Sequence, residues 1–380
     1  MTAGRDIRRG VLFLQIADPG YYPPLIHASS LMAEAGWSVV LLSAPITGAA
    51  LRMPERAGLT LCRIAERPTH VVSKRYFATY ALAAARLARR TAPDVIYASD
   101  EMSAGPALLA RALTGAKLVY HEHDSPDPDR GRSKFGALRA MALRRADIVV
   151  FPNAMRARHV KDDVGMPDGK VIVVANVPRR CEIARAVGSA EAPLTLHYHG
   201  NISPDLLPMS VVRAILRMEG EARLQFAGYE APGAPGYIDA LVNLPRMRRD
   251  TIAYLGMLPR DRLLAQAARA HVGLALMPRR STSINLRHAT GASNKAFDYM
   301  AAGLSLMVSD LPDWVGMFVE AGYGRAVDPD NVDAVYDALR WFVSHPQERA
   351  AMAARARARI AADWNYDTAF APVLERLVDG

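Results

Sequence analysis

Three polar residues near the start of a predicted helix have the types and the spacing of a nucleotide site. The stretch runs from Ala292 to Gly303, and its pattern predicts a helix that ends at Gly303 before an apolar strand. Asn294 and Lys295 lie in the first turn, where unpaired backbone N–H groups and the positive end of the helix dipole favour a phosphate. Asp298 follows one turn later on about the same face, where a carboxylate can accept both hydroxyls of a ribose. These residues therefore predict half of a nucleotide site.

The same helix carries a resemblance to a known family. Asn-Lys-Ala-Phe-Asp-Tyr-Met-Ala-Ala-Gly, from Asn294 to Gly303, resembles the donor-binding helix of the retaining glycosyltransferases of family four, also called group 1, which share the GT-B fold. The resemblance implies transfer of a sugar from a nucleotide sugar to an acceptor hydroxyl, with retention and without a metal or other cofactor. An ordinary amphipathic helix explains the apolar residues of this stretch but not its three polar ones.

One position departs from the family's pattern, which has two glutamates with seven residues between them. Asp298 matches the second glutamate, and the first falls on Thr290. No Asp or Glu occurs from Arg262 through Phe297, so the predicted donor side is almost purely electropositive. Because a hydroxyl can both donate and accept a hydrogen bond, we predict an unusual or anionic donor sugar rather than glucose.

The bulk composition is that of a basic globular protein. The chain has 380 residues, enough for two domains of ordinary size, and its 51% hydrophobic and 22% charged residues exclude a disordered chain. A net charge of +9 suits an anionic ligand, an anionic membrane surface or nucleic acid. Two cysteines provide no disulfide framework and favour a reducing compartment, which predicts a cytoplasmic protein. No uninterrupted apolar stretch reaches the ~20 residues that a membrane span needs.

The first half of the chain reads as a Rossmann-like domain. An apolar strand at 11–17, a loop with Gly20 and Tyr21, a helix near 25–35 and a strand at 38–43 form a βαβ opening. Asp100 follows a predicted strand at 94–99, and His121 follows another at 117–120. The carboxyl ends of such strands meet at the edge of the sheet where ligands bind. The resemblance implies that these ends face a cleft on the acceptor side, which gives four candidate residues: Gly20, Tyr21, Asp100 and His121.

The strand end at His121 continues into a cluster of imidazoles and carboxylates. In the resembled family, His123 aligns with a histidine near the donor sugar and the acceptor, and Asp124 replaces a usual glutamate. The resemblance thus implies catalytic roles for His123 and Asp124, together with Lys295 at the departing diphosphate. A metal site is the second interpretation, because these side chains are suitable ligands. It ranks lower, since neighbouring residues on a strand alternate faces, and the cluster matches neither H-E-x-x-H nor the spacing of a calcium loop.

The second half repeats the strand, loop and helix pattern, and its strand ends supply the remaining donor-side candidates. Gly200 is followed directly by Asn201 after a strand at 194–199, and a backbone without a Cβ lets a diphosphate approach. Here too the resemblance guides the assignment, because the family's diphosphate and base lie at these loops. The predicted donor-binding residues are Gly200, Asn201, Tyr229, Met257, Leu258, Arg279, Arg280, Thr290, Ser293, Asn294, Lys295 and Asp298.

A basic helix in the first half has two interpretations. The segment 74–90 is amphipathic, and its polar side carries Arg75, Arg86, Arg89 and Arg90. This side is either an ordinary solvated face or a site for anionic lipid headgroups, which would place the protein peripherally at the inner membrane surface. The arginine-rich segment 346–362 lacks the aromatic interleaving of stacking platforms, so nucleic acid is not a predicted partner.

The predicted architecture is α/β, with two Rossmann-like domains facing across a cleft and a C-terminal helix that crosses back to the first domain. The first domain comprises 1–182 with the terminal helix at 363–380, and the second comprises 190–362. The predicted activity is glycosyl transfer to a glycan, a lipid-linked or a small-molecule acceptor, in polysaccharide or glycolipid biosynthesis. The alternatives are a nucleotide-sugar epimerase or hydrolase on the same fold, and a donor-binding module without turnover.

Overall fold

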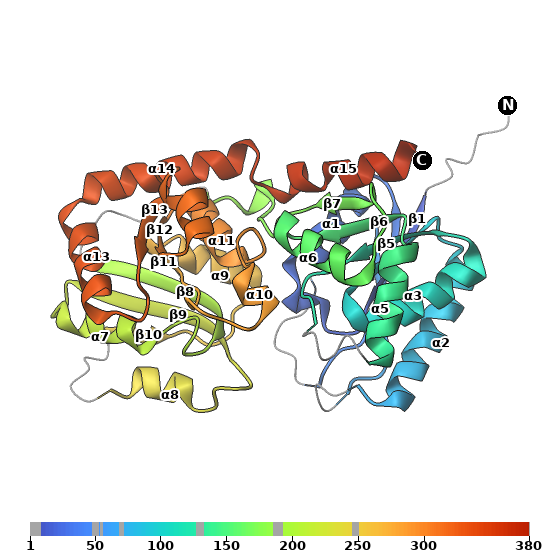
Figure 1. Ribbon diagram of the computed structural model, residues 1–380, viewed down its shortest axis with the longest axis horizontal. Helices are drawn as coiled ribbons and strands as arrows, with labels where there is room; N and C mark the ends of the chain where they lie inside the picture. The colour runs from blue at the N-terminus through green and yellow to red at the C-terminus, as the bar shows by residue number, and fades with distance from the viewer. Residues whose placement is uncertain are drawn as a thin grey trace. The chain divides into compact units, whose positions relative to one another are not determined.

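The chain forms two compact units in the computed structural model, which describes residues 9–47, 53, 56–67, 72–126, 133–184, 193–244 and 251–379. Unit 1 is Met1–Ala175 with Ala369–Gly380, and unit 2 is Asn176–Thr368. The chain thus crosses between the units twice, after Ala175 and after Thr368. Each unit holds one parallel sheet with helices packed against it (Figure 1), which confirms the predicted α/β class with two Rossmann-like domains.

Unit 1 is built on a seven-stranded parallel sheet with the order β3-β2-β1-β4-β5-β6-β7. Its strands are β1 (Gly10–Gln15), β2 (Ser38–Ser43), β3 (Leu59–Arg63), β4 (Val95–Ser99), β5 (Lys117–His121), β6 (Ile148–Phe151) and β7 (Val171–Val173). Its helices are α1 (Pro23–Glu34), α2 (Lys74–Thr91), α3 (Asp100–Thr114), α5 (Lys134–Arg145), α6 (Ala154–Val164) and most of α15 (Tyr366–Asp379). The central strands are apolar and fully buried, as expected of a sheet covered on both faces.

Unit 2 is built on a six-stranded parallel sheet with the order β10-β9-β8-β11-β12-β13. Its strands are β8 (Leu194–Ile202), β9 (Ala222–Glu230), β10 (Ile252–Tyr254), β11 (Val272–Ala275), β12 (Ser305–Ser309) and β13 (Gly324–Val327). Its helices are α7 (Met209–Arg217), α8 (Tyr237–Val242), α9 (Arg260–Ala267), α10 (Ile284–Arg287), α11 (Asn294–Ala302), α12 (Pro312–Trp314), α13 (Val332–Ser344) and α14 (Pro346–Ala362).

The strand order reverses once in each sheet, and the reversal marks where ligands bind in open α/β sheets. In unit 1 the reversal lies between β1 and β4, so the loop with Gly20 and the residue Asp100 both lie beside it. In unit 2 it lies between β8 and β11, so Gly200 and Asn201, at the carboxyl end of β8, lie beside it. The topology therefore places the main predicted site residues of each unit at that unit's own reversal point.

Helix α11 is held against the sheet of unit 2 by a glycine and a tyrosine. A Cβ at Gly273 of β11 would lie 2.2 Å from the Tyr299 ring, so this ring can pack on the strand only because Gly273 has no side chain. The hydroxyl of Tyr299 accepts a hydrogen bond from the backbone N–H of His199 at 2.9 Å. Gly303 ends the helix with a φ of 81°, a left-handed conformation that suits glycine. The N-terminus of α11 is thereby fixed at the reversal point.

Three helices lie side by side on one face of the unit 1 sheet. Helix α2 packs against α3, and α3 packs against α5. Tyr80 of α2 is fully buried, and its hydroxyl donates to the carbonyl of Leu42 at 2.8 Å.

No helix among the described residues combines the length and the hydropathy that crossing a bilayer requires.

Candidate functional site

The end of β8 and the start of α11 meet at Gly200. This residue has a φ of 110°, and a Cβ built on it would lie 3.3 Å from Cε and 3.6 Å from Nζ of Lys295. The Lys295 ammonium thus lies directly against bare backbone, and it also lies 5.5 Å from the centroid of the Tyr198 ring. A side chain at position 200 would be strained and would displace the lysine. The structure therefore brings together Gly200 and Lys295, which the sequence predicted separately as donor-side residues.

A second glycine keeps this backbone bare. Gly228 of β9 pairs with Gly200 in the sheet register, and a Cβ on it would lie 1.9 Å from the Gly200 carbonyl oxygen. The φ of Gly228 is 133°, so glycine is required there on both counts. The sequence analysis did not identify Gly228. Two adjacent strand ends without side chains give a diphosphate room to approach the backbone N–H groups.

The N-terminus of α11 has no side-chain cap. Ser293 is the N-cap residue, but its side chain accepts no hydrogen bond from the first turn. Ser293, Asn294 and Lys295 are all half-buried. The first backbone N–H groups of a helix have no partner within it, and together with the helix dipole they favour an anion. Bare backbone, an uncapped helix start and one cation therefore converge on one place.

Lys295 has an unusual protonation equilibrium. Burial lowers its pKa to about 8, and the nearby carboxylate of Asp298 opposes that shift. Among the described residues, none forms a hydrogen bond or an ion pair with the ammonium group of Lys295. The lysine is therefore free to bind a ligand, and it is charged at neutral pH but not far above it.

We expect the affinity for a nucleoside diphosphate to fall as the pH rises above about 8, because the protonated lysine is the form that attracts phosphate. If only that form binds, affinity should fall about tenfold per pH unit above this value. Titration calorimetry between pH 7 and 9.5 measures this dependence. A Lys295→Arg variant is the control, since arginine stays protonated throughout and its profile should be flat. An equally flat profile for the wild-type protein would contradict the role of Lys295.

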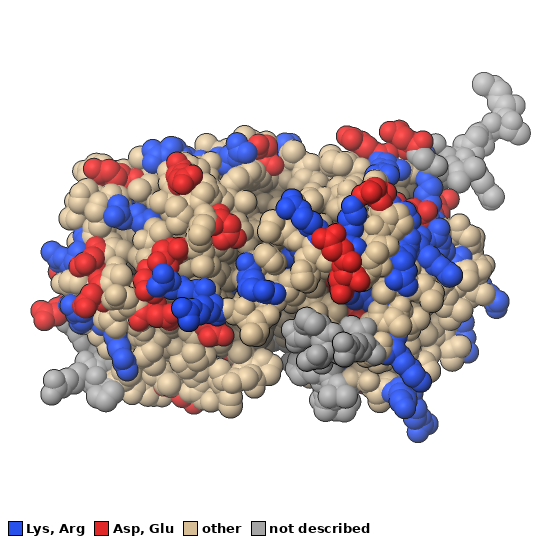
Figure 2. Space-filling view, in the orientation of Figure 1, with Lys and Arg blue, Asp and Glu red and all other residues tan. Residues whose placement is uncertain are grey.

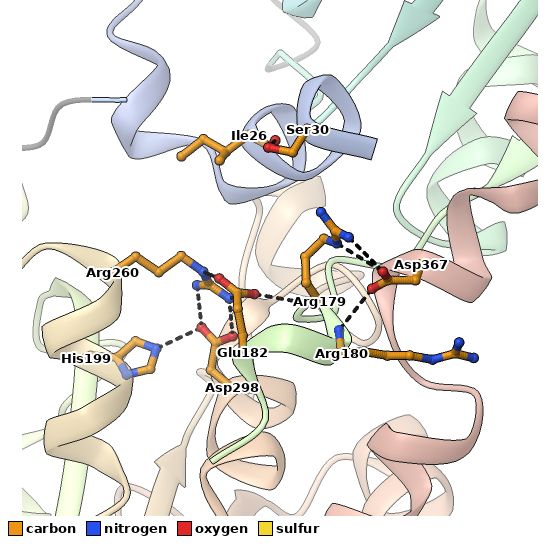
Figure 3. A network of polar contacts seen from close by, with 9 residues as sticks. All are labelled: Ile26, Ser30, Arg179, Arg180, Glu182, His199, Arg260, Asp298 and Asp367. Carbon is orange, nitrogen blue, oxygen red and sulfur yellow. Dashed lines mark hydrogen bonds and ion pairs between the residues drawn. The ribbon is translucent and has the colours of Figure 1, made fainter. Parts of the chain in front are cut away.

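Asp298 is buried in a network of charged side chains (Figure 3). Arg260 donates to both of its oxygens, from Nη1 to Oδ2 at 3.1 Å and from Nη2 to Oδ1 at 2.8 Å. His199 lies 3.2 Å from Oδ2 through Nε2. Burial raises the pKa of Asp298, but Arg260 and His199 together lower it by a larger amount, so the pKa lies below its usual value. The ribose contact predicted for Asp298 stays a prediction, because the structure shows this carboxylate bonded to protein groups.

The imidazole of His199 begins a chain of buried polar groups. His199 Nδ1 lies 3.2 Å from His197 Nε2, and His197 Nδ1 lies 3.3 Å from Gln225 Nε2. If His199 donates its Nε2 proton to Asp298, then His197 donates to His199 and Gln225 donates to His197, so each group has one consistent role. Burial lowers the pKa of both histidines, which keeps them neutral. The chain therefore fixes the orientation of Asp298 without adding charge.

Exposed apolar side chains lie at the carboxyl ends of β9 and β10. Tyr229 is 42% exposed, Tyr254 is 39% exposed and Met257 is 36% exposed, whereas Leu258 is half-buried. Large apolar groups left exposed together commonly mark a binding surface. Flat rings and a thioether suit the face of a nucleobase, which agrees with the predicted donor-side role of Tyr229 and Met257.

The structure pairs two further predicted residues with carboxylates. Arg279 forms ion pairs with Asp310 at 3.2 Å and with Asp328 at 2.7 Å, and Thr290 donates to Asp313 through its hydroxyl. The expectation of an almost purely electropositive donor side is therefore wrong. Asp310, Asp313 and Asp328 follow the ends of β12 and β13, outside the segment from Arg262 through Phe297 on which the expectation was based. Arg280 is exposed.

In unit 1, residues 122–124, which follow β5, are each held by hydrogen bonds or ion pairs. Glu122 is buried, and Arg139 of α5 donates to its two oxygens at 2.6 Å each. Asp100 accepts from the backbone N–H of His123 at 2.9 Å, and Arg156 of α6 donates to the His123 carbonyl at 2.7 Å. The metal interpretation loses support because both carboxylate oxygens of Glu122 already accept hydrogen bonds from Arg139. No group of three potential ligands for a metal occurs among the described residues.

Asp100 holds this loop from a strained position. Its φ is 62°, which is uncommon for a residue with a side chain. Burial raises its pKa to about 8, and the nearby Asp124 adds to that shift. Asp100 is therefore largely protonated at neutral pH and acts as a neutral anchor for the loop. Asp124, in contrast, is exposed and lies 3.5 Å from Arg156.

The ring of His123 is the part of this loop that the protein leaves unbonded. It is 5% exposed, and neither ring nitrogen has a hydrogen-bond partner among the described residues. Its ring lies 3.9 Å from that of His121 and 5.8 Å from that of Tyr22, between centroids. Tyr22 directly follows the predicted Gly20 and Tyr21, so the first loop and the His121 loop are brought together. Burial lowers the pKa of His123 to about 3, so it offers a neutral donor and acceptor.

Sequence reasoning missed several residues on which the site depends. Arg260 and Glu182 come from segments without a motif, and no local pattern pairs them with Asp298. Arg139 also lies in a segment without a motif, and it is buried against Glu122. His199 carried a usable signal, since it alternates with His197 along β8 and so faces the same side of the strand.

Comparisons with known proteins give the class of protein to which this chain belongs. Residues 25–177 match the family Glycosyltransferase Family 4, and residues 211–375 match the family Glycosyl transferase-like. The fold and both matches define a glycosyltransferase. The chain belongs to the GT-B glycosyltransferases, as the resemblance of its donor helix predicted. Comparison with curated protein sequences finds no significant match.

Solved structures share the fold over nearly the whole chain at low identity. Sucrose-phosphate synthase from Thermosynechococcus elongatus has a TM-score of 0.72 at 14% identity, over 97% of this chain and 98% of that one. HepE from Anabaena, solved with UDP and glucose, has a TM-score of 0.70 at 14% identity, over 98% and 100%. WaaG, a glycosyltransferase involved in lipopolysaccharide biosynthesis, has a TM-score of 0.66 at 12% identity, over 97% and 100%.

Proposed function

We propose that this glycosyltransferase moves a sugar from a nucleotide sugar to a hydroxyl of a glycan or lipid acceptor, with retention, in polysaccharide or glycolipid biosynthesis. The observation that carries the donor half is the convergence of Lys295, the bare backbone of Gly200 and the uncapped start of α11. Each of these features favours a diphosphate independently. HepE was solved with UDP and with UDP-glucose, so uracil nucleotides are the first donors to test.

The proposed chemistry assigns separate tasks to the two units. The bond between the sugar's anomeric carbon and the diphosphate oxygen breaks, and the acceptor oxygen bonds to that carbon on the face that the diphosphate leaves. Lys295 and the start of α11 stabilise the negative charge that develops on the departing diphosphate, which carries the acceptor's proton away. His123, neutral and unbonded, orients a hydroxyl through a hydrogen bond. Asp100 and Arg156 hold His123 by its backbone.

A product-resolved assay tests this function. The protein is incubated with UDP-, GDP-, ADP-, CDP- and dTDP-sugars and with an acceptor mixture, and the products are separated by mass spectrometry. Transfer to an acceptor supports the proposal. An epimerised donor or free sugar as the only product would indicate the epimerase or hydrolase alternative. Binding without any product would indicate a donor-binding module.

A membrane surface is the second part of the proposal, and it rests on the outer side of α2, α3 and α5. The arginines Arg75, Arg86, Arg89 and Arg90 are all exposed, and Lys and Arg recur on this part of unit 1 in the view of Figure 2. Leu82, on the same side of α2, is 54% exposed, and Leu109 on the adjacent α3 is 42% exposed. Neither α2 nor α5 contains an acidic residue. Exposed leucines among unopposed cations suit an anionic lipid surface.

Reversing the four arginines of α2 to glutamate should reduce binding to anionic vesicles by more than tenfold, since each basic residue near such a surface contributes about 1 kcal/mol. Binding of the wild-type protein should weaken as salt screens these charges. Vesicle co-sedimentation over a salt series measures both effects. The matched control reverses four exposed arginines elsewhere, Arg213, Arg262, Arg269 and Arg376. Equal losses in the two variants would show that only net charge matters.

A further inference from the structure

The two segments that connect the units are bonded to each other within unit 2. We call residues 176–184 the first connector and residues 365–368 the second connector. Arg179 donates to Asp367 Oδ1 from Nε at 3.2 Å and from Nη2 at 2.8 Å, and the Arg180 N–H donates to Asp367 Oδ2 at 2.9 Å. The Tyr366 N–H donates to the Pro178 carbonyl at 2.9 Å. The connectors therefore form one hydrogen-bonded unit.

The first connector is also bonded to both ends of the donor helix. Asn176 donates to the carbonyl of Gly291 from its backbone N–H at 3.0 Å and to that of Ala292 from Nδ2 at 2.6 Å. At the other end, the N–H of Ala184 donates to the carbonyl of Ala301 at 3.0 Å. The connector thus follows α11 from the loop before its start to its last turn.

Arg260 joins this connector to the donor site (Figure 3). It donates to Glu182 of the first connector from Nε at 2.5 Å and from Nη2 at 3.0 Å, while Nη1 and Nη2 donate to Asp298. Four of its five N–H groups are therefore engaged, between two carboxylates. Glu182 also accepts from the backbone N–H of Arg179 at 2.8 Å. One guanidinium thus links Asp298 to Glu182 and, through Arg179, to Asp367.

We propose that Arg260 is a positioning residue for Asp298, and that through Glu182 it couples donor binding to the order of both connectors. The proposal rests on the proposed function in that α11 must be the nucleotide site. Because such coupling is a free energy shared between two sites, it acts in both directions. Donor binding orders the connectors, and loosening the connectors weakens donor binding.

The balance of charge explains why donor binding would change the contacts of the first connector. Arg260 forms ion pairs with the carboxylates of Asp298 and Glu182, and Lys295 interacts electrostatically with Asp298. When a diphosphate engages Lys295, Asp298 depends more fully on Arg260 for its compensation. Since Arg260 is held at the same time by Glu182, the connector must adjust with it.

Hydrogen exchange measured by mass spectrometry tests the coupling, with UDP as the probe. In the wild-type protein, UDP should slow exchange in peptides that cover 176–184 and 363–368. In Glu182→Gln, which removes the charge that holds Arg260, this slowing should be lost and UDP affinity should fall at least about fivefold. Glu221→Gln is the matched control, because it removes an exposed Arg–Glu pair of the same unit, with Arg340 at 2.7 Å, and should behave as wild type.

A second variant separates positioning from general stability. Arg260→Lys keeps the positive charge, but an ammonium group cannot form paired hydrogen bonds to both Glu182 and Asp298 as the planar guanidinium does. We expect it to raise the KM for the donor about tenfold while changing kcat much less, because it misplaces Asp298 without touching the acceptor side. A fall in kcat alone would contradict the positioning role.

The outcomes distinguish this proposal from the proposed function. UDP binding without slower connector exchange in the wild-type protein would overturn the coupling and leave the donor site intact. Equal slowing in Glu182→Gln and in the wild-type protein would also overturn it. If the wild-type protein bound no nucleoside diphosphate in calorimetry, the donor site itself would be wrong and the coupling would fall with it.

Discussion

Replacing Lys295 with alanine is expected to weaken UDP binding by about 10- to 150-fold while leaving the fold intact. A hydrogen bond to a charged group contributes about 1.5–3 kcal/mol, and among the described residues Lys295 is the charged side chain that lies against the bare backbone of Gly200. The fold should survive, because the Lys295 ammonium forms no ion pair within the described residues. Calorimetry gives the affinity, and circular dichroism checks the fold.

The control for this prediction is Arg269→Ala, which removes an exposed cation of the same unit. Both variants lose one positive charge, so a difference between them reports position and not net charge. Lys295→Arg should recover part of the affinity, although a guanidinium fits less well than an ammonium beside Gly200. An unchanged dissociation constant for a folded Lys295→Ala protein would refute the assignment of the donor site.

Asp298→Ala is expected to lower the free energy of unfolding of unit 2 by about 3–5 kcal/mol, even in the absence of a nucleotide. The cause is that His199 would lose its acceptor, and that the two cations Arg260 and Lys295 would be left with Glu182 for compensation, so that part of the buried charge would be unbalanced. Urea denaturation measures the difference. Asp310→Ala removes a partly exposed partner of Arg279 and should cost no more than about 1 kcal/mol. Equal costs for the two variants would show that the buried network contributes little.

The same carboxylate should contribute to acid sensitivity. The pKa of Asp298 in the folded protein lies below its usual value of 3.8. Its contribution to stability is therefore complete above that value and is lost as the pH falls through the lowered pKa. The Asp298→Ala variant should lack this part of the pH dependence. Denaturation curves between pH 2 and 6 compare the slopes of the two proteins.

Much of the fold followed from local patterns. Buried parallel strands are short apolar runs, so β1, β2, β4 and β5 were recognisable. The residues predicted at the sheet edge, Gly20, Tyr21, Asp100 and His121, lie at or after the ends of β1, β4 and β5. The donor helix was predicted from Asn294 to Gly303, and α11 ends at Ala302 with Gly303 in the left-handed conformation. The glycine and the apolar spacing determine both ends of this helix without tertiary help.

The residues that the sequence did not reveal are those whose roles depend on contacts between distant segments. Arg260 lies 38 residues from Asp298 and 78 from Glu182. Nothing in its surroundings distinguishes it from the other arginines of the chain. In the same way, Asp313 reaches Thr290 only because β12 ends at the edge of the sheet where α11 begins. An electropositive site inferred from one segment was therefore wrong once other strands supplied their carboxylates.

The central claim is that the start of α11 and the bare backbone of Gly200 form the donor site, and a crystal structure with UDP tests it most directly. We expect the diphosphate within hydrogen-bond distance of Lys295 Nζ and of the first N–H groups of α11, with the base against Tyr229 and Met257. UDP bound away from α11, or with its diphosphate on a different helix, would show that the donor site lies elsewhere.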